Sequence, residues 1–92
     1  MQMTLERERA NEVERHERET MNSHVREQVI RALGEPADLL DVQVRPLWGP
    51  HYRVNVFVGV NITCARIIHS FFLVTDGNGN VLESTPTIKR QY

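Results

Sequence analysis

The hydrophobic repeat of the chain changes at Gly34, from a period of about 3.6 residues to a period of two. Before this point the apolar residues of segment 23–33 recur at i, i+4 and i+8, which is the pattern of an amphipathic helix. Asn22 or Ser23 can cap the start of this helix, and Gly34 followed by Pro36 ends it. The chain therefore folds as a helix that is followed by strands.

Beyond the helix the sequence predicts four short strands. The first two alternate apolar and polar residues, and the third is apolar at almost every position. An Asp-Gly-Asn-Gly-Asn sequence at 76–80 joins the last two strands as a hairpin, and Pro86 places the fourth at or near an edge. Because the connections are short, neighbouring strands should pair antiparallel. The predicted strands are residues 40–45, 52–60, 65–75 and 81–85.

We therefore predict an α+β fold, in which one or two N-terminal helices are followed by a four-stranded antiparallel β-meander. The 92 residues are the length of one domain, residues 1–92, with a correspondingly small core. Within it we expect a charged helical extension at 1–22, an amphipathic helix at 23–33 and an antiparallel sheet at 39–88.

The predicted extension is highly charged. Residues 6–19 contain six Glu and four Arg, which lose little side-chain freedom in a helix. The apolar residues Leu5, Val13 and Met21 recur every eight residues, which matches neither a continuous stripe nor a heptad. Three interpretations remain open: a solvated helical extension, a helix that becomes ordered by packing on a partner protein, and, less favoured by this spacing, a coiled coil.

Composition excludes several classes of function. The chain has 11 Lys and Arg against 12 Asp and Glu, for a net charge of -1, so it lacks the basic surface that nucleic-acid binding requires. No apolar run approaches the roughly 18–20 residues of a membrane span. The first 20 residues have no apolar signal-peptide core, which predicts a soluble cytoplasmic protein.

The third predicted strand is the feature that bears most on function. One helix covers one face of a sheet, and the other face of a monomer should be polar. Both the odd and the even positions of residues 65–75 carry large apolar side chains, so one set must form an exposed apolar patch beside Phe57. Which set meets the helix stays open. The predicted interface residues are Phe57, Ile67, Ile68, Phe71 and Phe72.

Three arrangements can cover this patch. A second copy can pack on it sheet to sheet or continue the sheet, the charged N-terminal helix can fold across it, or a ligand or another protein can occupy it. The charged helix has few apolar residues for this task. We predict a homodimer, because two-fold pairing uses a surface that the sequence already encodes.

The sequence contains no catalytic constellation. Cys64 has no second cysteine with which to form a disulfide or a structural zinc site. His16 and His24 are eight residues apart and do not make the i,i+4 pair of a zinc helix. Residues 76–80 resemble the start of a calcium loop, but the Gly and Glu that such a loop needs at positions six and twelve are absent. We predict no catalytic residue, no metal and no cofactor.

Four residues are the best candidates for ligand binding: Trp48, Tyr52, Arg53 and His69. Trp48 and Tyr52 flank a Gly-Pro-His turn beside Arg53, and aromatic and Arg side chains are enriched at binding hot spots. His69 lies within a strand, where an imidazole can act as a base or a ligand. The structural alternatives are that Trp48 closes the end of the core and that His69 is a core or interface histidine.

Two functions from different classes follow from these features. The first is a non-catalytic interaction module that self-associates through its sheet. The alternative is a small-ligand-binding protein or small enzyme with a pocket between helix and sheet or between subunits. The polar groups of that pocket would be His69, Cys64, Tyr52 and Arg53.

Overall fold

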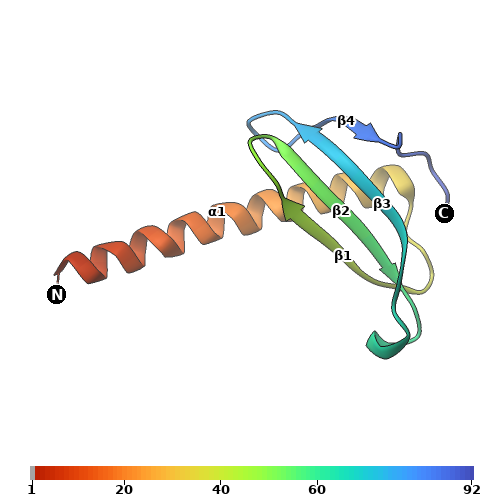
Figure 1. Cartoon of the computed structure of the whole chain (residues 1–92), viewed down its shortest axis with the longest axis horizontal. Helices are drawn as coiled ribbons and strands as arrows, with labels where there is room; N and C mark the ends of the chain where they lie inside the picture. The colour runs from red at the N-terminus through yellow and green to blue at the C-terminus, as the bar shows by residue number, and fades with distance from the viewer. Residues whose placement is uncertain (1) are drawn as a thin grey trace.

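The computed structural model describes residues 2–92, and the side chains of residues 12–92, as one helix followed by a four-stranded sheet (Figure 1). Its elements are α1 (Gln2–Leu33), β1 (Leu39–Pro46), β2 (His51–Val58), the 3-10 helix η1 (Ile62–Cys64), β3 (Arg66–Thr75) and β4 (Val81–Thr85). The strands pair antiparallel in the order β1-β2-β3-β4, so the predicted α+β meander is confirmed. Residue 1 of the predicted extension lies outside the described residues.

α1 is one continuous helix of 32 residues rather than two shorter ones. Its C-terminal part lies across one face of the sheet, and its N-terminal part continues past the two hairpin turns (Figure 1). The side chains of residues 12–20 are all exposed. This projection raises the radius of gyration to 15.7 Å, whereas a compact chain of this length has about 12 Å. No helix in the described part of the chain is long and apolar enough to cross a membrane.

The core lies between α1 and the sheet. Val25, Val29 and Leu33 are buried on one face of α1, as their spacing predicts. They pack on valines of β1 and β2 and on Phe71 and Leu73 of β3. Each fully buried aliphatic side chain contributes roughly 1.5–3 kcal/mol, so this layer is the main source of stability.

Side chains of α1 also hold both edges of the sheet. Arg26 Nε donates a hydrogen bond to the carbonyl oxygen of Val42 in β1, at 3.0 Å. At the other edge, Gln28 Nε2 donates to the carbonyl oxygen of Gly79 at 2.7 Å, and Gln28 Oε1 accepts from the amide of Val81 at 2.9 Å. These bonds fix the angle at which the helix crosses the strands.

A bulge in the β2–β3 pair decides which residues of β3 face the helix. The register shifts after Val56, so that Val56 lies opposite His69 while Phe57 lies opposite Ile67. Ile68 is the extra residue, and it packs against the core. The alternation of β3 therefore changes phase at this point, and Ile67 faces away from α1 beside Phe57.

The predicted β3–β4 hairpin turn is confirmed, and Asp76 organises it. Asp76 Oδ1 accepts hydrogen bonds from the amides of Asn78 at 2.8 Å and Asn80 at 2.9 Å, and Oδ2 accepts from Asn80 Nδ2 at 3.0 Å. Gly79 has a φ of +82°, and a Cβ at this position would overlap the sulfur of Met21. Glycine is thus favoured by the positive φ of the turn, and it also allows the close approach of the Met21 side chain.

Replacing Gln28 with Ala leaves the Gly79 carbonyl and the Val81 amide without their side-chain partner. We expect Gln28→Ala to lower the free energy of unfolding by about 1–3 kcal/mol, because both bonds are partly buried. The control Glu27→Ala, at an exposed position of the same helix, should change it by less than about 0.5 kcal/mol. Urea unfolding followed by circular dichroism measures both values, and equal effects would contradict the role of Gln28.

The stability of the β3–β4 turn should depend on acid. The hydrogen bond from the Asn80 side chain, and then the backbone bonds, lower the pKa of Asp76 below its usual value of 3.8. Such a carboxyl group stabilises the fold above its unfolded-state pKa, and this contribution is lost as the pH falls through the folded-state pKa. Between about pH 5 and about pH 3 the urea midpoint should therefore fall further in the wild-type protein than in Asp76→Asn. A parallel decline in both proteins would count against this role.

Candidate functional site

The side of the sheet that faces away from α1 is left uncovered by the residues that the structure describes (Figure 1). Successive residues of a strand point to opposite faces, so the residues between the buried valines of β1 and β2 point away from α1. The pairing of the strands then identifies the residues of β3 and β4 that lie on the same side. We call this surface the open face. Its strand residues are Asp41, Gln43, Arg45, His51, Arg53, Asn55, Phe57, Ile67, Ser70, Phe72, Val74, Glu83 and Thr85.

The hairpin end of the open face is basic and aromatic. Arg45 and Arg53 lie directly opposite each other on β1 and β2, and Phe72 lies opposite Arg53 on β3. Trp48, from the β1–β2 turn, lies near Phe72 and His51, with ring centroids 6.2 Å and 4.9 Å apart. Arg45, Trp48, Arg53 and Phe72, which we call the basic–aromatic end, line part of a shallow hollow of about 860 Å³.

Hydrogen bonds across the open face orient Arg53. Its Nη1 atom donates to Ser70 Oγ at 3.3 Å, and Ser70 Oγ donates to Asn55 Oδ1 at 2.7 Å. The acidic residues of this face lie elsewhere, with Asp41 near the opposite end and Glu83 on the outer strand β4. Like charges that face each other across two strands are destabilising, so the two arginines are available to pair with carboxylates of a partner.

The opposite end of the open face is apolar. Phe57 and Ile67 lie opposite each other, and the Ile67 side chain is 51% exposed. Leu40 and Ile62 are also exposed, and together with Phe57 they line a second hollow of about 580 Å³. We call Leu40, Phe57, Ile62 and Ile67 the apolar end. Exposed apolar side chains gathered in one place are typical of an interaction surface.

Each outer edge of the sheet has a feature that hinders pairing with another strand. On β1, the Val42 amide donates to Asp41 Oδ1 at 2.8 Å, and the Val42 carbonyl accepts from Arg26, so these groups are already bonded. β4 has five residues and ends before Pro86, which has no amide hydrogen to donate. These features favour association through the open face over continuation of the sheet.

The residues predicted to bind a ligand do not converge. Trp48 and Arg53 lie at the basic–aromatic end, whereas Tyr52 and His69 lie on the side of the sheet that faces α1. Cys64 is exposed in η1, beyond the other end of β2. Tyr52 and Arg53 separate because neighbouring residues of a strand point to opposite faces. Trp48 is 65% exposed, so it does not close the end of the core.

The predicted interface residues divide between the two sides of the sheet. Phe57, Ile67 and Phe72 lie on the open face. Phe71 is buried in the core, and Ile68 packs against it. The bulge after Val56 causes this division, because it places Ile67 and Phe72 on the same side although one is odd-numbered and the other even-numbered.

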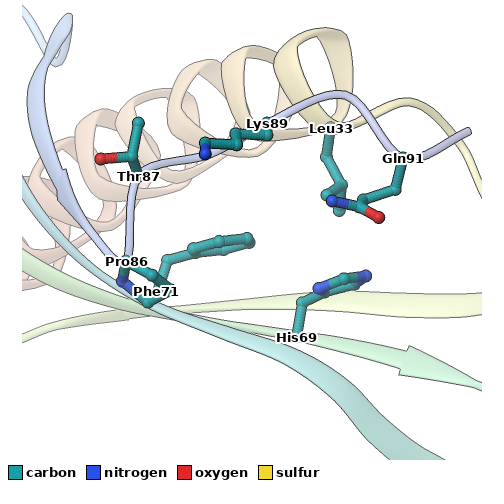
Figure 2. Close-up of a pocket in the computed structure, with 7 residues that line it drawn as sticks. All are labelled: Leu33, His69, Phe71, Pro86, Thr87, Lys89 and Gln91. Carbon is teal, nitrogen blue, oxygen red and sulfur yellow. The ribbon is translucent and has the colours of Figure 1, made fainter.

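On the side of the sheet that faces α1, a cavity of about 430 Å³ lies between the end of α1, β3 and the C-terminal tail at residues 86–92 (Figure 2). The tail returns to α1, where the Gln91 amide donates to the Leu33 carbonyl at 2.8 Å and satisfies a free group at the helix end. In Figure 2 the side chains of Leu33 and Gln91 reach from the helix and the tail toward His69 on β3. The cavity is lined by Leu33, His69, Phe71, Pro86, Thr87, Lys89 and Gln91.

His69 connects the tail to the sheet. Its Nε2 atom is hydrogen-bonded to Tyr92 Oη at 3.0 Å, and its ring stacks on Phe71 with centroids 5.9 Å apart. Sequence reasoning missed the tail, because residues 86–92 have no periodic apolar pattern. The one residue in the sequence that relates to the position of the tail is Gly34. Its φ is +92°, and a Cβ at this position would lie 2.7 Å from the Tyr92 carbonyl oxygen, so a glycine lets the tail approach the end of α1.

The remaining chemistry-bearing side chains are dispersed. His24 Nε2 is hydrogen-bonded to Asn80 Oδ1 at 2.9 Å, and so forms part of the contact between α1 and the β3–β4 turn. The Cys64 sulfur lies 3.9 Å from Thr63 Oγ1. Among residues 12–92, no three His, Cys, Asp or Glu side chains are grouped closely enough to hold a metal ion.

Comparison of the chain with protein-family models, with curated proteins and with solved structures finds no match. Function must therefore be inferred from the geometry of the chain itself. Two features are relevant: the open face of the sheet and the cavity beneath the C-terminal tail.

His69→Ala removes both the hydrogen bond to Tyr92 and the stacking contact with Phe71. We expect it to lower the free energy of unfolding by about 1–3 kcal/mol. Tyr92→Phe removes the hydroxyl group alone and should have a smaller effect, of about 0.5–1.5 kcal/mol. Urea unfolding tests the order of the two effects, and unchanged stability in both variants would show that this contact does not hold the tail.

Proposed function

We propose that the protein is a non-catalytic interaction module that forms a homodimer through the open face of its sheet. The observation that carries this proposal is the exposure of Trp48 and Ile67 on the open side of a sheet whose other side carries the buried core beneath α1. Soluble monomers rarely leave large apolar side chains gathered on one uncovered surface. A second copy that covers this face would bury them.

The accessible area of the chain also supports association. It is 6808 Å², whereas a compact protein of 10.7 kDa has about 5,500 Å², an excess of about 1,300 Å². A stable interface of standard size buries about 800 Å² on each partner. The projection of α1 beyond the sheet exposes surface that a compact chain would bury, and the excess is larger than the area that one partner contributes to such an interface.

A second candidate function is binding of a small ligand in the cavity beneath the tail. It is favoured by the position of the cavity between helix and sheet, by its volume of about 430 Å³, and by the His69 and Lys89 side chains in its lining. Under this alternative, His69→Ala removes ligand binding while the fold persists. Under the homodimer proposal, the same substitution affects stability and leaves self-association intact.

The homodimer proposal is tested by placing a charge at the apolar end. Ile67→Lys should raise the Kd of self-association at least about tenfold, because it puts an ammonium group among the apolar side chains that the interface would bury. The control is Val60→Lys, at a 90% exposed position in the loop after β2. Sedimentation equilibrium measures each Kd, and circular dichroism checks that both variants are folded.

Two outcomes would contradict the proposal. The first is a wild-type protein that sediments as a 10.7 kDa monomer at about 100 µM, far above the Kd of a specific dimer. The second is a dimer that Ile67→Lys and Val60→Lys weaken equally, since the open face would then have no special part in it.

A further inference from the structure

Residues 12–20 of α1 are exposed at the edge of the packed structure, and three of them, His16, Glu17 and Thr20, border a shallow hollow that Asn78 of the β3–β4 turn also lines. The β3–β4 turn contacts α1 at Met21 and His24, and the helix continues from there beyond the sheet. Every side chain from residue 12 to residue 20 is exposed, including Val13 at 58%. An isolated helical segment gains little from its own hydrogen bonds in water and is normally stabilised by tertiary packing. A partner that covered this segment would supply such packing.

The projecting segment and the open face have complementary charge. Residues 12–19 contain four Glu and two Arg, which gives a net charge of −2. The basic–aromatic end of the open face presents Arg45 and Arg53 side by side. Both surfaces belong to the same chain, so a second copy supplies the acidic partner that the arginines lack in their immediate surroundings.

The spacing of the charges also matches. Glu14 and Glu17 are separated by three residues on α1, which puts their Cβ atoms about 5–6 Å apart. Arg45 and Arg53 are directly opposite on antiparallel strands, where Cβ atoms are about 4.5–5.5 Å apart. Each carboxylate can thus meet one guanidinium. Val13, next to Glu14 in sequence and one helical turn from Glu17, is the apolar residue of this segment.

We propose that the N-terminal half of α1 in each copy lies across the open face of the other copy. In this arrangement Glu14 and Glu17 pair with Arg45 and Arg53 of the second chain, and Val13 packs on its Trp48. The proposal rests on the homodimer proposed above and names the element that occupies the open face.

Symmetry allows this exchange to be reciprocal. Within one chain, α1 and the open face lie on opposite sides of the sheet, and α1 projects past the hairpin end (Figure 1). A two-fold rotation that brings the two hairpin ends together places each projecting half over the open face of the other copy. Because α1 is continuous, the segment cannot turn back to cover the open face of its own chain.

The lengths agree with this arrangement. Residues 2–20 of α1 span about 28 Å at 1.5 Å per residue. An eight-residue strand such as β2 spans about 26 Å. The projecting half of the helix is therefore about as long as a strand of the open face.

Charge reversal tests the proposed contact. Arg45→Glu/Arg53→Glu and Glu14→Arg/Glu17→Arg should each raise the Kd of self-association at least about tenfold, because like charges then meet in both halves of the dimer. An equimolar mixture of the two variants should recover the wild-type Kd, because every reversed helix meets a reversed face and every native helix a native one. The matched control Arg31→Glu/Arg66→Glu alters exposed arginines outside the open face and should leave the Kd unchanged.

The outcomes separate this inference from the homodimer proposal. If the charge reversals leave the Kd unchanged while Ile67→Lys raises it, the open face mediates association but the helix is not its occupant. If each variant dissociates and the mixture stays dissociated, the named charges do not meet. A wild-type monomer overturns both proposals.

The single cysteine gives an independent readout of the geometry. Cys64 is exposed in η1, which joins β2 to β3 at the end of the sheet opposite the hairpin turns. With the hairpin ends together, spin labels on the two Cys64 residues should be about 50 Å apart, twice the length of an eight-residue strand. A separation below about 40 Å would be too short for two sheets that meet at their hairpin ends and would overturn the helix exchange.

Discussion

A single helix can cover only one face of a four-stranded sheet, and this constraint governs the rest of the molecule. Val25, Val29 and Leu33 occupy the inner face, and the bonds from Arg26 and Gln28 hold the helix there. The other face must then be stable in water or be covered by something else. Its two arginines, its aromatic rings and its apolar end are consistent with a surface that is covered on association.

The sequence was sufficient for the fold because its signals are local. The change of period at Gly34, the spacing of Val25 and Val29, and the turn at 76–80 each act within a few residues, and the structure agrees with all three. The bulge after Val56 is different in kind. It depends on pairing between β2 and β3, so alternation along β3 alone could not assign its two faces.

The candidate site could be located in part. The doubly apolar third strand pointed to an uncovered surface, but the pairing of Arg45 with Arg53 needs the register of two strands, and the sequence does not state it. The tail was out of reach for a similar reason, since its anchor is the distant carbonyl of Leu33. Contacts between residues far apart in the chain leave no periodic pattern in the sequence. Such contacts place two of the predicted ligand-binding residues on the open face and two on the side that faces α1.

An unbroken α1 also means that its two halves share one helical phase. Each residue advances the helix by about 100°, so the direction in which Glu17 points is set by how Val25 sits on the sheet. One residue inserted after Thr20 would swing the whole N-terminal half through about 100°, whereas four inserted residues would bring it back to within about 40° of its original direction. The valine core thus determines the orientation of a charged surface several turns away, through the backbone hydrogen bonds of the helix alone.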